Sequence, residues 1–323
     1  MRYVPAFIAV FLFCALTTDH VSAVPLVSPK NETNFSPLPN QPLFSVETDI
    51  FLGQKRGRGG GRVWANTYYG DTTLKPVEGG RIDPSLYGLQ IGVDLVQAHC
   101  VYSTFFFNVN QSKVKFGNNF GGGSSIIDNY HLGYGKFVYL SMCHLALTGS
   151  IGYDRYEVTR MGTGTGDGLQ SNFFGEFGLD FLFGQWALKP FYALQYDFLY
   201  HGKIGKSPVL YEDWNGHGLQ QLFGLRVIWK PKEILELQSR VTWVHELLDN
   251  PPPFYHVRFS PLHGINTPAV LFHEGDTGRD WAWLGIGAKL DIAFDVYLFL
   301  DYDILLNERH TTHLGSLGLC LCW

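Results

Sequence analysis

Residues 188–200, LKPFYALQYDFLY, alternate between two kinds of side chain with a period of two residues. Successive side chains of a β-strand point to opposite sides of its sheet. The run therefore predicts a strand that lies between an apolar and a polar environment. The first face holds Tyr192, Leu194, Tyr196 and Phe198, and the second holds Ala193, Gln195 and Asp197.

The same alternation recurs from about residue 62 to the end of the chain and is sharp in 171–184 and 296–304. The connections between the alternating segments are long and short in turn. Tight turns on one side and longer loops on the other are typical of an antiparallel barrel in a membrane. The long connections fall near 70–84, 110–124, 155–169, 203–216 and 249–278, and the short ones near Gln97, Lys136, Gly184, Pro231-Lys232 and Phe294-Asp295.

The fold class predicted from this pattern is all-β, a transmembrane antiparallel up-and-down β-barrel. An even number of strands returns both ends of the barrel to the side of the short turns, which would face the periplasm. About twelve strands are expected, at 62–70, 85–96, 98–109, 125–137, 139–154, 170–184, 186–202, 217–229, 236–248, 279–291, 294–306 and 309–323.

The composition agrees with a barrel in lipid. Charged residues make up 16% of the chain, where soluble domains have about 25%. The mean hydropathy is only -0.01, and no internal stretch approaches the roughly 18 apolar residues of a spanning helix. A closed barrel spreads its apolar surface in thin stripes and leaves no backbone group unpaired in hydrocarbon. A soluble sandwich would carry more Lys, Glu and Thr on its outer face.

Residues 1–23 resemble a secretory signal peptide. Arg2 precedes an apolar run that ends at Leu16, and Val21-Ser22-Ala23 is a small-residue cleavage site. Cleavage after Ala23 is expected, and a short uncleaved anchor is the alternative. The implied partner is the Sec export machinery.

Residues 24–61 form a short leader and linker before the barrel. Leu43, Val46 and Ile50 have the spacing of one short amphipathic helix near 43–52, a possible plug of the lumen, and an irregular leader is the alternative. The following segment 54–62 is basic and rich in glycine, hence flexible. Beside a barrel it is expected to meet acidic lipid or an acidic lumen, and not nucleic acid.

The polar faces of the strands supply a network of lumen residues. A lumen with both signs of charge either closes itself by hydrogen bonds or lines a wet channel. Both readings stay open, and excess acid would favour cations in an open pore. Asp301 and Asp303 share a face and could hold a cation, although pairing with Arg226 or Arg240 is favoured. The set comprises Gln90, Asp94, Glu176, Asp180, Gln195, Asp197, Arg226, Gln238, Arg240, Glu246, Lys289, Asp301 and Asp303.

The final strand has one apolar face and stops on an aromatic residue, Trp323. A chain that ends on such a strand resembles the recognition signal of the outer-membrane barrel assembly machinery. The predicted assembly signal consists of Leu317, Leu319, Leu321 and Trp323.

Catalytic and cofactor motifs are weak. His245-Glu246 and His273-Glu274 each lack the second histidine of a zinc-protease motif. No GxSxG sequence occurs, and the glycine-rich run 162–168 is expected to be an outer loop. The sequence therefore predicts no enzyme, no cofactor and no metal site. No disulfide is assigned to Cys100, Cys143, Cys320 and Cys322, which are expected to be small wall residues.

The chain resembles the translocator domain of the autotransporter family, which carries out type V secretion in Gram-negative bacteria. The resemblance extends over about 62–323, and it implies a twelve-stranded barrel, a helix in the lumen and an N-terminal passenger. It rests on residues 62–70 (RVWANTYYG), 87–94 (YGLQIGVD), 190–196 (PFYALQY), 223–227 (FGLRV), 243–246 (WVHE) and 284–288 (LGIGA).

One feature departs from the family, because residues 24–61 leave no room for a folded passenger. The predicted function is an integral outer-membrane barrel that anchors in lipid and passes, or is plugged by, its short N-terminal segment. The alternative is an outer-membrane channel or a structural or adhesive barrel that acts through its lumen or its long outer loops.

Overall fold

The computed structural model describes residues 61–74, 82–98, 101–116, 124–140, 142–159, 164–203, 209–211, 214–248, 254–259, 270–273, 279–293, 295–307 and 310–323. The predicted signal peptide 1–23, the leader up to residue 60 and its helix at 43–52 lie outside these residues. Within them, no helix has the length and apolarity needed to cross a membrane.

Twelve antiparallel strands form the barrel, as the sequence predicted. The short strand β7 (Phe181–Phe183) continues β6, because both pair with β8 in one register. The twelve are β1 (Gly61–Leu74), β2 (Ile82–Ala98), β3 (Val101–Phe116), β4 (Ser124–Leu140), β5 (Cys143–Val158), β6 (Gly164–Leu179), β8 (Trp186–His201), β10 (Trp214–Lys232), β11 (Leu235–Glu246), β14 (Asp280–Ala293), β15 (Val296–Leu306) and β16 (His310–Cys322).

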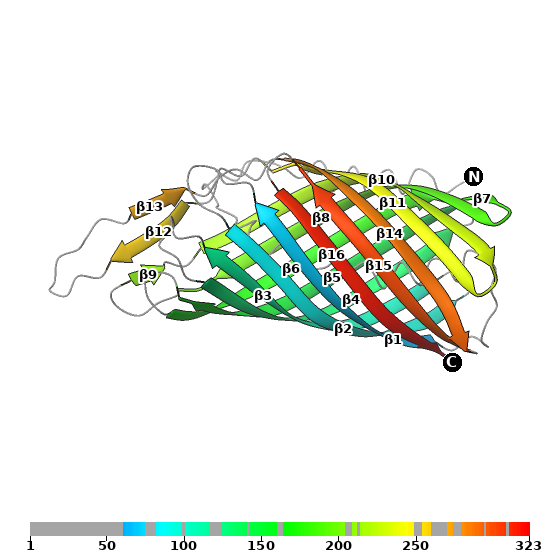
Figure 1. Ribbon diagram of the computed structural model, residues 1–323, viewed down its shortest axis with the longest axis horizontal. Coiled ribbons are helices and arrows are strands. Elements are labelled where there is room, and N and C mark those ends of the chain that lie inside the picture. The colour runs from blue at the N-terminus through cyan, green and yellow to red at the C-terminus, as the bar shows by residue number, and fades with distance from the viewer. Residues whose placement is uncertain are drawn as a thin grey trace.

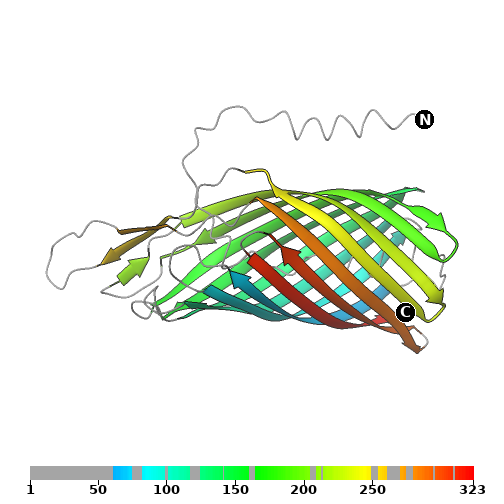
Figure 2. The same ribbon diagram turned by 45° about the horizontal axis from the view of Figure 1, so that its top comes forward.

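The barrel closes between its first and last strands. β1 pairs with β16 along its whole length and with β2 on the other side. At the start of β1, the amides of Gly61 and Trp323 donate to each other's carbonyl oxygens at 3.3 and 3.1 Å. Both barrel termini therefore lie at the end that carries the short turns, called here the short-turn end, and the other end is the loop end (Figures 1 and 2).

The short turns are mostly where the sequence placed them. Gly184 and Asp295 turn the chain with φ of 62° and 61°, a left-handed conformation that favours glycine and tolerates aspartate. The turn predicted at Lys136 is wrong, because β4 runs through Lys136 and ends at Leu140. Lys136 is an exposed residue on the outer face of that strand.

Two predicted loops contain strands. The glycine-rich run that was expected to be a loop begins β6 at Gly164 and pairs with Asp154–Val158 of β5. Within 249–278, β12 (Phe254–Phe259) and β13 (Val270–His273) pair with each other, and β12 also pairs with β9 (Val209–Tyr211). This small sheet lies at the loop end of the barrel (Figure 1).

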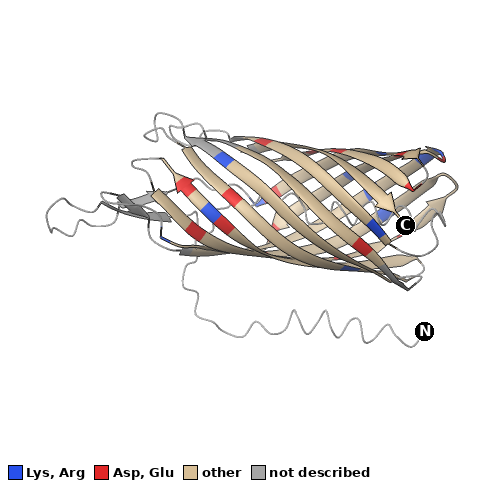
Figure 3. Ribbon diagram, turned by 90° about the horizontal axis from the view of Figure 1, so that it is seen from below, with Lys and Arg blue, Asp and Glu red and all other residues tan. Residues whose placement is uncertain are grey.

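The outward faces of the strands are apolar and exposed. Ile151 and Leu132, for example, show 65% and 62% of their surface, which a bilayer would cover. Outward aromatic residues lie toward both ends, with Tyr130, Tyr153 and Trp243 toward the loop end and Trp186 and Trp323 at the short-turn end, and others, such as Phe173, lie mid-strand. Charged residues occupy few positions along the strands (Figure 3).

Large side chains also fill part of the lumen. One apolar cluster packs across β6 to β14, with Phe174, Phe191, Ala193, Leu222, Val244, Trp281 and Trp283. Glycines on neighbouring strands make space for such rings. A Cβ atom on Gly92 would lie 2.1 Å from the Trp64 ring, and one on Gly318 would lie 2.0 Å from the Phe299 ring. These rings occupy the space over the adjacent strand because that strand has no side chain there.

Candidate functional site in the polar lumen

Buried charges on the lumen face gather in three groups of contacts. We call them the β5–β10 cluster, the β11–β15 cluster and the β1–β15 cluster after the strands they join. Most of the charged residues predicted for the lumen belong to them, and buried carboxylates outnumber buried cations. The carboxylates are Asp94, Asp154, Glu176, Asp180, Asp197, Glu236, Glu246 and Asp303, and the cations are Arg62, Lys189, Arg226 and Lys289.

The β5–β10 cluster comprises His144, Glu176, Asp180, Lys189 and Arg226. The imidazole of His144 lies between two carboxylates, with Nδ1 2.9 Å from Asp180 Oδ2 and Nε2 3.0 Å from Glu176 Oε1. This arrangement suits a protonated ring, since ionised carboxylates only accept hydrogen bonds. Lys189 Nζ lies 3.3 Å from Asp180 Oδ1. All of these side chains are nearly or fully buried.

Arg226 closes this cluster by reaching over a strand. It extends from β10 across β8, where its guanidinium lies 4.0 Å from the centre of the Phe191 ring. On β6 it donates to both oxygens of Glu176, with Nη1 2.6 Å from Oε1. A two-point bond between arginine and carboxylate fixes geometry as well as charge. The pair therefore holds three strands in one arrangement.

The β11–β15 cluster contains two more bridges that cross a strand. Arg240 of β11 reaches across β14 and donates from Nη2 to Asp303 Oδ1 of β15 at 2.5 Å. Gln238 of β11 likewise donates from Nε2 to Asp301 Oδ1 at 2.7 Å. Trp283 Nε1 also donates to Asp303 at 3.0 Å, and the Arg240 guanidinium lies 3.8 Å from the centre of the Trp283 ring.

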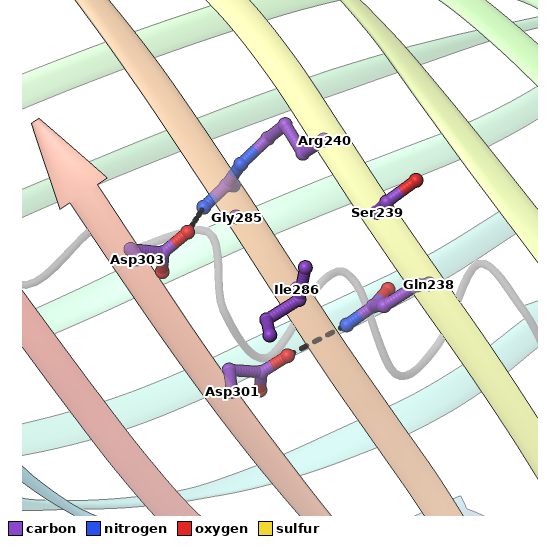
Figure 4. A pocket seen from close by; sticks show the side chains of 7 residues that line it. All are labelled: Gln238, Ser239, Arg240, Gly285, Ile286, Asp301 and Asp303. Atoms are coloured by element: carbon purple, nitrogen blue, oxygen red, sulfur yellow. Dashed lines mark hydrogen bonds and ion pairs between the residues drawn. The ribbon is translucent and has the colours of Figure 1, made fainter.

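Glycines on β14 make these two bridges possible. A Cβ atom on either Gly285 or Gly287 would lie 2.2 Å from the carboxylate that is bound above it. A pocket opens at this point of the wall, lined by Gln238, Ser239, Arg240, Gly285, Ile286, Asp301 and Asp303 (Figure 4).

The β1–β15 cluster lies beside the barrel closure. Arg62 Nε is 2.5 Å from Asp94 Oδ2, and its Nη1 donates to the Tyr297 hydroxyl at 2.9 Å. Trp64 Nε1 donates to the other oxygen of Asp94 at 3.1 Å. The Lys289 ammonium lies 3.9 Å from the centre of the Tyr297 ring. The first residues of β1 are thus tied to strands on both sides.

The remaining predicted lumen residues lie outside the three clusters. Gln195 Nε2 donates to Asp197 at 3.0 Å, and Asp197 also accepts from Asn172. Glu246 accepts from the Leu219 amide at 3.0 Å. Gln90 is buried on the lumen face of β2.

Sequence reasoning missed three basic members of the clusters. Arg62 was assigned to the basic linker and the start of the first strand, and His144 and Lys189 were not singled out. The signal for Lys189 was present, because it shares the period of Ala193, Gln195 and Asp197 on β8. His144 likewise shares the buried period of β5.

The described residues hold no group of three His, Cys, Asp or Glu side chains placed to bind a metal ion. Cys143, Cys320 and Cys322 are free thiols, and Cys320 is fully buried. The predicted assembly-signal residues Leu317, Leu319, Leu321 and Trp323 are all exposed, the first three on the outward face of β16. Whether they act as a signal remains a prediction.

The family model described as "Autotransporter beta-domain" matches residues 63–303. No curated protein matches the sequence.

Solved structures that resemble the barrel include three autotransporter domains. The translocator domain of the autotransporter NalP from Neisseria meningitidis has 13% identity and a TM-score of 0.67, covering 92% of this chain and 100% of its own. The transport unit of the autotransporter AIDA-I from Escherichia coli has 14% identity and a TM-score of 0.64, covering 87% of this chain and 98% of its own. The β-domain of the Bordetella autotransporter BrkA has 14% identity and a TM-score of 0.59, covering 82% of this chain and 100% of its own. At these identities the likeness is one of fold.

Proposed function

The chain belongs to the autotransporter β-domain family, and from that premise we propose that its barrel anchors the protein in the outer membrane while residues 24–60 pass outward through the lumen or plug it. Barrels of this family are outer-membrane proteins. The apolar outward faces and the aromatic residues near both ends support burial in a bilayer.

One observation carries the proposal for the N-terminal segment. β1 begins at Gly61, at the short-turn end and beside Trp323. Residues that precede Gly61 therefore start at the mouth of the lumen. Fully extended, they are long enough to traverse a barrel whose strands have 11–19 residues. The excess of buried carboxylates favours the basic segment 54–60 inside that lumen.

The proposal includes three partners. Outer-membrane lipid would surround the apolar belt, the Sec machinery would export the chain through residues 1–23, and the barrel assembly machinery would read Leu317, Leu319, Leu321 and Trp323. Each follows from the family and from the sequence features described above.

The test is the conductance of single barrels in planar bilayers, measured for the full chain and for a deletion of 24–60. A plug predicts a low conductance that rises on deletion. Passage to the outside predicts that protease added to intact cells cleaves within 24–60. An equally conducting pore in both proteins, with no surface cleavage, would support the channel and overturn the proposal.

A further inference from the structure

The lumen carboxylates differ in what balances their charge. In the three clusters, Asp94, Glu176, Asp180 and Asp303 each lie beside a cation of the wall. Asp301 differs from these four, because its hydrogen-bond partner is the neutral amide of Gln238 at 2.7 Å. Asp197 and Glu246, outside the clusters, also accept from neutral groups but are buried.

Asp301 is also accessible from the lumen side. It lines the pocket with Gln238, Arg240, Gly285 and Asp303 (Figure 4), and it is only half-buried, whereas Asp303 is buried. The nearby Arg240 is bound to Asp303. An ionised carboxylate in such a low-dielectric site is stabilised when a cation approaches it. The pocket thus has the chemistry to receive one cationic side chain.

The barrel closure fixes where such a cation can come from. Asp301 pairs with Ser316 of β16, which pairs with Tyr68 of β1. It therefore lies seven residues along β1 from Gly61 and two strands across, a path of roughly 25 Å. From Gly61 back to Lys55 or Arg56, an extended backbone covers about 17–20 Å, and a long side chain spans the rest. Arg58 is too close to Gly61 to reach.

We propose that the Asp301 pocket receives Lys55 or Arg56 and thereby holds the linker against the lumen wall. This inference rests on the proposed function, since it names the contact through which the N-terminal segment stays in the barrel. The linker is the occupant because its charge is complementary and its attachment at Gly61 is within reach.

The experiment compares the conductance of charge variants with that of the wild type. D301N keeps an oxygen that accepts from Gln238 but removes the charge, and K55Q/R56Q removes the cations. Each variant is expected to raise the ratio of open to plugged barrels by about tenfold, which is the effect of losing one hydrogen bond between charged groups. The reversed pair D301K with K55E/R56E is expected to restore the plug.

A matched control keeps the test specific. D71N removes a charge from the exposed outer face of β1 and is expected to conduct as the wild type does. Heat-modifiable mobility on gels establishes that each variant forms a barrel.

A second measurement detects the contact directly. A carbodiimide joins a carboxylate to an amine with loss of water, which the reagent takes up as it becomes a urea. Treatment of the wild type is expected to yield, by mass spectrometry, a peptide in which Asp301 is joined to Lys55. In R56K the new amine at position 56 can also react with the activated Asp301 carboxyl group and form a second cross-linked peptide. Neither cross-linked peptide is expected in D301N.

The outcomes separate this contact from the plug itself. If deletion of 24–60 opens the barrel while D301N and K55Q/R56Q behave as wild type and no cross-linked peptide forms, the contact is wrong and the plug stands. If the deletion changes nothing, both fail.

Discussion

The two faces of β14 show how one strand serves two environments. Toward the lumen it presents Trp283, Gly285 and Gly287, over which side chains of β11 reach to β15. Toward the outside it presents Leu284 and Ile286, which are exposed and whose only need is an apolar surrounding. Around Leu284 and Ile286 the outer face is thus specified by polarity, and its specific hydrogen bonds lie at the loop end, where Asp280 accepts from Trp243 Nε1 at 2.9 Å.

This difference predicts how substitutions act on the two faces. On the lumen face the shape and charge of one side chain decide whether a distant strand is held. At the lipid-facing positions Leu284 and Ile286 of the outer face, any apolar residue of similar size is expected to be tolerated and a charge to be destabilising. Four substitutions test this contrast, and their expected effects decrease in the order given.

Glu176→Gln is expected to have the largest effect. It removes the negative charge that pairs with Arg226, while the Arg226 guanidinium stays buried in the lumen over the Phe191 ring. Breaking a buried ion pair from one side costs about 3–5 kcal/mol, measured as the free energy of unfolding in urea for the barrel in lipid vesicles. Glu233→Gln, in an exposed turn at the short-turn end, is the control. Equal stability of the two variants would contradict the role of the bridge.

Ile286→Arg tests the outer face of the same wall. Ile286 is 64% exposed on β14, and an arginine near the middle of a bilayer costs about 2–4 kcal/mol on a barrel surface. Ile286→Leu is expected to unfold at the urea concentration of the wild type. If the arginine variant is as stable as the leucine variant, this face is not in hydrocarbon.

Gly92→Ala compares glycines on the two faces. Its methyl group would lie 2.1 Å from the ring of Trp64, which is buried and held by Asp94. Overpacking of this kind costs about 1–3 kcal/mol. Gly315→Ala places its methyl group in open space and is expected to leave the free energy of unfolding unchanged. A similar loss in both would mean that strand flexibility, and not the ring contact, requires glycine.

Much of the fold was predictable because the period of two residues is a local property. The twelve strands and the faces of Tyr192, Gln195 and Asp197 follow from it. The turn expected at Lys136 is wrong because lysine is common in turns, whereas Lys136 lies on the outer face near a barrel end, where its long stem can extend to the boundary. The run from Gly164 is a strand although glycine disfavours strands, and Gly168 lies against the Tyr156 ring.

The lumen contacts were less predictable than the fold. The alternation of residues indicates that Arg226 and Glu176 face inward, but their pairing depends on how the strands are staggered around the barrel. A bridge that skips β8 joins residues on strands that are not neighbours. His144 and Lys189 were missed for the same reason. A single histidine or lysine in a strand does not indicate an ion pair, because the partners of these two residues lie on other strands.

The smallest effect on stability is expected for Trp323→Ala. The side chain is 54% exposed at the short-turn end, and the two hydrogen bonds that tie residue 323 to Gly61 are made by its backbone. The free energy of unfolding should therefore change by about 1 kcal/mol or less. If the terminal aromatic is read during assembly, the yield of heat-modifiable barrel in cells falls sharply while the purified barrel stays stable. Trp323→Phe keeps an aromatic ring and is expected to assemble normally. Normal assembly of the alanine variant would remove Trp323 from the signal and leave Leu317, Leu319 and Leu321 to be tested together.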